Sequence, residues 1–288
     1  MIECGSEGAS VVDSRDVREI IRSKSNWDYY DESLDKISDD HAFVTGCFGE
    51  NSEIKPLADL LKSYLGREAE LSVSLCDSAD WENEWKKYYS PLDFGSIVVV
   101  PEWLDGKYDK PKILIDPGMA FGTGTHHTTR MCLELLEKNI KNGDLVADLG
   151  CGSGILSIAA SLMGAKETYA IDIDPVAARV AAENAELNGI DMPGYFIRIG
   201  DILSDEKFRD DISGRQYDIV LANIVANVII AFAPVIPQLM KPDGKLIASG
   251  IIADRLDEVL DALKANGLEA VEICSGEDWR AVLAAKIS

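Results

Sequence analysis

The segment DLGCGSG at residues 148–154 restricts the possible folds more than any other part of the sequence. It follows an apolar run at residues 145–149, which predicts a buried strand, and it precedes an apolar run at 155–163, which predicts a helix. Glycines at such a turn can adopt positive φ and let the backbone approach a ligand without a side-chain clash. The GxGxG spacing differs from the GxGxxG of dinucleotide-binding enzymes. We therefore expect a ligand-binding turn after the first strand of a sheet.

Apolar runs and helical patterns alternate along the chain from residue 113 onward. This alternation is typical of right-handed crossovers and a doubly wound parallel sheet. The predicted strands are residues 145–149, 168–173, 195–199, 219–222 and 246–248, with two closing strands at 268–274 and 280–287. The predicted helices are 155–163, a helix capped by Asp174 and ended by Gly189, 225–240 with a break near Pro234 and Pro237, and a stripe from Leu256 to Leu263, while KPDG at 241–244 predicts a turn.

Polar residues follow the predicted parallel strands, where such sheets bind their ligands. Asp172 ends the second strand, and its two carboxylate oxygens could accept both hydroxyls of a ribose. Asp201 follows the third strand and could meet an adenine amino group, or it could equally be a solvated acid of a loop. Asn223 follows the fourth strand. These residues indicate a nucleoside cofactor, but they leave open a nicotinamide dinucleotide or S-adenosylmethionine.

Composition excludes several other classes of function. The 288 residues carry 28 basic and 50 acidic side chains, a net charge of −22, which repels nucleic acid and anionic lipid and attracts a basic partner. No apolar run reaches the roughly 18–20 residues of a membrane helix, and the first residues lack a signal-peptide pattern. Six scattered cysteines and three histidines predict neither a disulfide framework nor a metal site. We therefore expect a reduced, cytoplasmic protein.

Further motifs make a resemblance specific. They are WENEWKKYY near residue 81, DPGMAFGTGTHHTT at 116–129, DLGCGSGILSIAA from 148, AIDIDPVA from 170 and NIVAN at 223–227. Together they resemble the PrmA family, the S-adenosylmethionine-dependent methyltransferases of large-subunit ribosomal protein eleven, over roughly residues 80–288. The resemblance implies an α/β fold, a Rossmann-like class I methyltransferase domain with a mixed seven-stranded sheet.

The resemblance also implies roles for individual residues. Thr129 matches a threonine that contacts S-adenosylmethionine, and Phe121 matches the aromatic residue of a mobile loop that covers it. Gly150 matches the glycine beneath the methionine part of the cofactor, with Gly152 in the same turn. Asp172 matches the ribose-binding acid, and Asn223 matches the asparagine that lines the methyl-transfer site. Asp201 stays a candidate for binding adenine.

The predicted domain organisation has three parts. Residues 1–80 are expected to form a small α+β substrate-recognition domain, 81–112 an inter-domain segment, and 113–288 the methyltransferase domain. In the family the chain opens with a strand and a helix of a ferredoxin-like domain. Here GSEGASVVDSRD near residue 5 resembles what normally follows them, so we expect an incomplete ferredoxin-like domain.

The resemblance implies an enzyme, a protein N-methyltransferase. It would methylate lysine side chains, an N-terminal α-amine, or both, on a basic ribosomal protein, without binding nucleic acid or membrane directly. The NIVAN segment lacks the proline and aromatic residues typical of enzymes that methylate adenine or glutamine amides, which favours an aliphatic amine. The alternatives are methylation of another protein or a small molecule, a cofactor-binding or ribosome-assembly module, and a nicotinamide dehydrogenase. The sequence leaves the oligomeric state open and is compatible with a monomer.

Overall fold

The computed structural model describes residues 8–13, 42–47, 91–95, 97–104, 106–116, 127–190 and 193–287. The chain divides into two compact units, Met1–Lys87 and Tyr88–Ser288. In the first unit, strands β1 (Gly8–Asp13) and β2 (Ala42–Cys47) pair antiparallel. The rest of the predicted substrate-recognition domain lies outside the described residues, so its incomplete ferredoxin-like character stays a prediction.

The second unit begins with a small three-stranded sheet of order β3-β4-β5. Strand β3 (Leu92–Asp93) pairs antiparallel with β4 (Val98–Pro101), and β4 pairs parallel with β5 (Lys112–Ile115). A short 3-10 helix, η4 (Glu102–Leu104), follows β4. Part of the predicted inter-domain segment 81–112 is thus folded structure of the second unit.

The large sheet has seven strands in the order β11-β12-β10-β9-β6-β7-β8. Its strands are β6 (Leu145–Leu149), β7 (Glu167–Asp172), β8 (Tyr195–Ile199), β9 (Tyr217–Asn223), β10 (Met240–Ile252), β11 (Leu268–Gly276) and β12 (Trp279–Lys286). Five neighbouring strands from β10 to β8 are parallel, whereas β12 runs antiparallel to both β10 and β11. The mixed seven-stranded sheet expected from the resemblance is confirmed.

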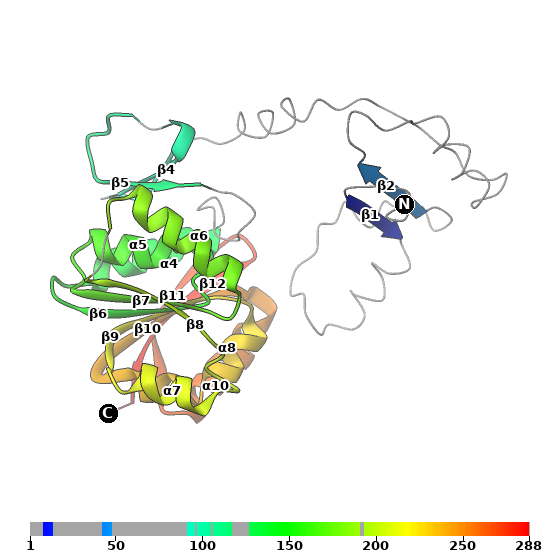
Figure 1. Ribbon diagram of the computed structural model, residues 1–288. Helices are drawn as coiled ribbons and strands as arrows, with labels where there is room; N and C mark the ends of the chain where they lie inside the picture. The colour runs from blue at the N-terminus through cyan, green and yellow to red at the C-terminus, as the bar shows by residue number, and fades with distance from the viewer. Residues whose placement is uncertain are drawn as a thin grey trace, which may run out of the picture. The chain divides into compact units, whose positions relative to one another are not determined.

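Helices cover both faces of this sheet, so its parallel strands are buried on both sides. Figure 1 shows α4 (His127–Asn139), α5 (Ile155–Leu162) and α6 (Pro175–Leu187) on one face. The opposite face carries α7 (Glu206–Ser213), α8 (Ala226–Phe232) and α10 (Leu256–Ala265). Helix α9 (Ile236–Leu239) and the 3-10 helix η5 (Ala253–Arg255) complete the connections. No helix among the described residues is long and apolar enough to cross a bilayer.

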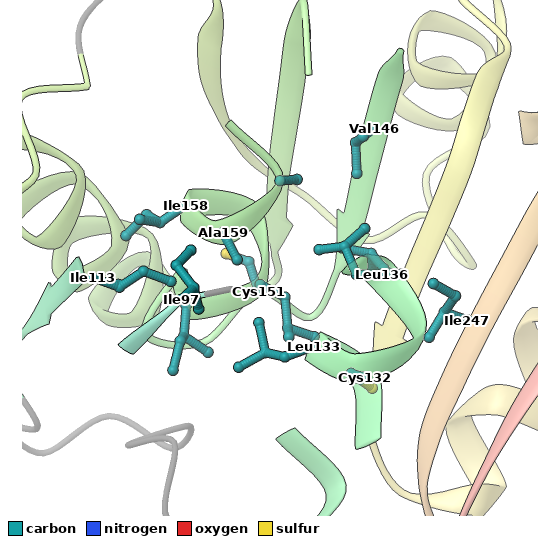
Figure 2. Packing of buried hydrophobic residues seen from close by; sticks show 14 of the residues in the cluster. Ile97, Ile113, Cys132, Leu133, Leu136, Val146, Cys151, Ile158, Ala159 and Ile247 are labelled. Carbon is teal, nitrogen blue, oxygen red and sulfur yellow. The ribbon is translucent and has the colours of Figure 1, made fainter. Parts of the chain in front are cut away.

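The hydrophobic core on the α4–α6 side extends into the small sheet. Leu133 and Leu136 of α4, each at most 1% exposed, share one cluster with Ile97 and Ile113 of the small sheet. Figure 2 shows these residues within the same packed cluster, together with Ile158 of α5. The small sheet is therefore held to the rest of the second unit by apolar burial as well as by chain connection.

The boundaries of most elements follow the sequence pattern closely. The helix predicted after Asp174 is α6, whose cap is the Asp174 side chain, accepting a hydrogen bond from Val176 N–H at 2.8 Å. The break predicted near Pro234 and Pro237 separates α8 from α9. The predicted turn at 241–244 lies instead within β10, where pairing with β9 changes register between Met240 and Lys245. The sequence analysis did not predict α4 and α7.

The packing of the small sheet predicts a stability effect. Ile113→Ala removes a fully buried side chain and should lower the free energy of unfolding by about 2–5 kcal/mol. The measurement is urea denaturation followed by circular dichroism. The matched control is Leu104→Ala in η4, because Leu104 is 37% exposed. An equal, small effect of both substitutions would mean that the small sheet does not share the core.

Candidate functional site

The glycine turn between β6 and α5 has three positions whose backbone conformation favours glycine. Gly150, Gly152 and Gly154 have φ of 71°, 53° and 79°, in the left-handed region that other residues rarely adopt. A Cβ atom at Gly150 would lie 2.9 Å from Cδ1 of Ile224, so even alanine would force that side chain to move. The close approach of Ile224 therefore requires glycine at position 150, directly after β6.

Asp172, at the end of β7, is connected directly to this turn. The backbone N–H of Gly152 donates to Oδ2 of Asp172 at 3.0 Å, and that of Asp174 donates to Oδ1 at 2.9 Å. Each carboxylate oxygen can accept a further hydrogen bond. The carboxylate is therefore held in a defined orientation while keeping acceptor capacity for two neighbouring hydroxyls.

A second pair of predicted residues meets at the end of β9. Nδ2 of Asn223 donates to Oγ1 of Thr129 on α4 at 3.3 Å, and Thr129 is buried. This contact orients the amide of Asn223 so that its carbonyl oxygen, Oδ1, points away from the threonine. The unpredicted helix α4 thus brings together two residues that the sequence analysis had selected separately.

The chain after Asn223 is positioned by a close approach of β10. Ile224 N–H donates to the carbonyl oxygen of Ser249 at 2.9 Å. Gly250, which follows Ser249 in β10, has φ of 85°, and a Cβ there would lie 2.4 Å from the carbonyl oxygen of Ile224. The approach requires glycine at position 250, a requirement that the sequence analysis missed because it comes from a neighbouring strand.

Asp201 makes its hydrogen bonds within its own turn. Its two carboxylate oxygens accept from the Ser204 hydroxyl at 2.6 Å and from Leu203 N–H at 2.8 Å. These hydrogen bonds, that of Ser204 foremost, lower the pKa of Asp201 below its usual value. Asp201 therefore has the geometry of a loop acid, one of the two alternatives that the sequence allowed. A contact between Asp201 and adenine stays a prediction.

Two further expectations concern Phe121 and metal binding. Phe121, predicted to cover the cofactor, lies outside the described residues. His127 begins α4, and its Nε2 lies 3.4 Å from Oε2 of Glu277 in the turn between β11 and β12. Within the described ranges, no group of three His, Cys, Asp or Glu residues could hold a metal ion.

Asp148 is a buried acid of the site that sequence reasoning did not single out. It is 1% exposed, and its Oδ2 accepts from Ser157 N–H at 3.0 Å. Desolvation by burial raises the pKa of Asp148 to about 7, against the opposing effect of Ser157. The signal in the sequence was its place inside an otherwise apolar strand, LVADL.

Taken together, the mixed sheet and the polar residues at its carboxyl edge define a Rossmann-like methyltransferase. The chain belongs to the family described as "Ribosomal protein L11 methyltransferase (PrmA)", whose model matches residues 1–287. It is 42% identical over 298 residues to the ribosomal protein L11 methyltransferase of Caldicellulosiruptor saccharolyticus, with 99% of this chain and 93% of that protein covered. The corresponding protein of Acetivibrio thermocellus is 40% identical, with 97% and 90% covered.

A solved structure agrees with this assignment. The ribosomal protein L11 methylase of Lactobacillus delbrueckii subsp. bulgaricus superposes with a TM-score of 0.63 at 31% identity. The match covers 69% of this chain and all of that one. The family and fold expected from the sequence motifs are confirmed.

The burial of Asp148 predicts a pH-dependent stability. The native state binds this proton with a pKa of about 7 and the unfolded state with one of 3.8, so stability falls as pH rises between these values. Asp148→Asn can still accept from Ser157 N–H and cannot ionise. Its unfolding free energy relative to the parent should increase with pH across this window, by up to about 1.4 kcal/mol per pH unit.

Urea denaturation at several pH values measures this difference. The exposed Asp243 provides a matched control, because Asp243→Asn removes a charge that water already solvates. A difference between Asp148→Asn and the parent that stays constant from pH 4 to 7 would contradict the assigned burial effect.

Proposed function

We propose that this protein transfers methyl groups from S-adenosylmethionine to amino groups of ribosomal protein L11, on lysine side chains, the N-terminal α-amine, or both. The observation that carries the proposal is the geometry of the carboxyl edge in a member of this family. There the glycine turn, a ribose-type acid and an oriented asparagine come from three adjacent strands, β6, β7 and β9. The relatives named above carry L11 methylation in their names.

The residues present fit S-adenosylmethionine. Gly150 would lie beneath the methionine part of the cofactor, beside the Ile224 side chain, and both oxygens of Asp172 can accept from ribose hydroxyls. Thr129 and Asn223 would line the methionine end, and Gly152 ties the turn to the acid. Phe121 and Asp201 are further candidates for contact. When bound, the cofactor supplies an activated methyl group on a sulfonium centre.

Asn223 is proposed to orient the acceptor amine. Since its Nδ2 is directed to Thr129, its Oδ1 can accept a hydrogen bond from an amine N–H and so aim the nitrogen lone pair. The amine must be neutral, whereas lysine and α-amines have ordinary pKa values of about 10.4 and 7.7–8.0. Desolvation in the site favours the neutral form, and Asn223 itself takes no proton.

We also infer the character of the partner. A net charge of −22 favours recruitment of a basic protein and disfavours nucleic acid and anionic membranes. The same charge stabilises ammonium, so it supports encounter with the substrate more than deprotonation of the amine. A cytoplasmic location is proposed because ribosomal proteins are made and assembled there, and a monomer suffices for the site as proposed.

The decisive experiment identifies the methylated product. The purified protein is incubated with labelled S-adenosylmethionine and undermethylated ribosomal proteins, and the products are identified by mass spectrometry. Label in L11 is expected. Label confined to another protein or a small molecule would replace the substrate proposed here, and cofactor binding without transfer would indicate a binding module.

The proposed role of Asn223 predicts a loss of turnover. Asn223→Ala should lower kcat by about 10²-fold, because the amine is no longer oriented, while changing the affinity for S-adenosylhomocysteine little. Steady-state kinetics with L11 measure this effect. The matched control is Asn227→Ala, since Asn227 is exposed and its side chain accepts from Arg255 instead. Near-normal turnover of Asn223→Ala would refute the role.

The proposed role of Asp172 predicts a loss of cofactor affinity. Asp172→Ala should raise the Kd for S-adenosylhomocysteine at least about tenfold, because hydrogen bonds to a charged acceptor are lost. Titration calorimetry measures this Kd. Asp174→Ala, two residues on, should instead lower stability by about 0.5–2 kcal/mol through loss of the α6 cap and leave the affinity nearly unchanged. Equal affinities of both variants would contradict the assignment.

A further inference from the structure

A buried asparagine on α6 joins the glycine turn to the small sheet. Asn184 is 0% exposed, and its Nδ2 donates to the carbonyl oxygen of Ser153 in the turn at 2.9 Å. Its Oδ1 accepts from the N–H of Asp116, the residue directly after β5, at 2.9 Å. One side chain therefore holds two backbone segments that are far apart in the sequence.

The same face of α6 supports the glycine turn at a second point. Ala181 lies one helical turn before Asn184, and a Cβ at Gly154 would be 3.0 Å from the Cβ of Ala181. The turn therefore lies close against α6 at Gly154, where a side chain would not fit, and is hydrogen-bonded to α6 at Ser153. Because three glycines of the turn have positive φ, its own backbone preferences do not select one shape, and external contacts must do so.

The next turn of α6 provides a natural comparison. Asn188 accepts from Leu114 N–H at 2.8 Å and donates to the Leu114 carbonyl at 2.7 Å, as a neighbouring strand would. β5 is the last strand of its sheet, and Asn188 pairs with its open edge. The side chain of Asn188 hydrogen-bonds β5 and α6, whereas that of Asn184 joins the residue after β5 to the glycine turn.

We propose that Asn184 is a positioning residue for the cofactor, holding the Ser153 carbonyl and hence the glycine turn in its binding shape relative to the chain that leaves β5. This inference rests on the proposed use of the glycine turn to bind S-adenosylmethionine. Asn184 does not act on the methyl group or the amine. Its loss should therefore weaken cofactor binding and raise KM for S-adenosylmethionine, while kcat at saturating cofactor changes little.

The test compares Asn184→Ala with Asn188→Ala in the full chain. Calorimetry gives the Kd for S-adenosylhomocysteine, thermal unfolding gives stability without ligand, and steady-state kinetics separate KM from kcat. Asn184→Ala should raise the Kd at least about tenfold, since a buried hydrogen bond to the turn is lost, with kcat within about threefold of the parent. Asn188→Ala should lower stability comparably but keep the Kd within about threefold.

Two results would overturn the inference. One is an unchanged Kd for Asn184→Ala beside a lowered unfolding temperature, and the other is an equal rise in Kd for both variants. If Asn184→Ala does not fold, the pair Asn184→Ser and Asn188→Ser is compared in the same way, because serine keeps a hydroxyl but is too short to span both partners. A parent chain that binds no S-adenosylhomocysteine would instead refute the proposed function itself.

Discussion

The hydrogen bond from Gly152 N–H to the carboxylate of Asp172 is the interaction on which the site depends. It joins the loops that leave two adjacent parallel strands, β6 and β7, at the edge where such sheets bind ligands. The bond uses one oxygen of a carboxylate whose other oxygen is held by Asp174 N–H. A flexible glycine turn and a charged side chain are thereby fixed to each other before any ligand arrives, which reduces the ordering cost of binding.

Close backbone approaches connect this arrangement to the end of β9. Gly250 lets β10 lie against Ile224, and Ile224 in turn lies over Gly150. A larger residue at Gly250 would press on the backbone of Ile224, next to Asn223, whereas one at Gly150 would displace the end of the Ile224 side chain. Asn223, the proposed methyl-transfer residue, and the proposed cofactor turn are therefore connected through the Ile224 side chain, and Asn184 contacts the same turn at Ser153.

Sequence reasoning succeeded where the local signal and the tertiary environment agree. Strand β6, the capped start of α6 and the break between α8 and α9 follow from apolar runs, Asp174 and the two prolines. It failed for residues 241–244, where KPDG resembles a turn but the chain continues in β10 with a shifted register. These four residues have no partner in β9, whose pairing passes from Met240↔Tyr217 to Lys245↔Ile219, so they form an irregularity inside the strand. Helix α4 was not predicted because it begins with His127, Thr128 and Thr129, residues of low helix propensity, and its apolar face starts only at Met131.

The candidate site divides in the same manner. The sequence alone determined which residue types stand after each parallel strand, because a strand's end is marked by its apolar run and the carboxyl edge of the sheet follows from topology. Only the tertiary structure decided that Asn223 meets Thr129, that Asp201 turns its carboxylate to its own loop, and that Asn184 holds the glycine turn. Those contacts join segments distant in the chain, and their existence depends on side-chain directions and helix placement that no local pattern encodes.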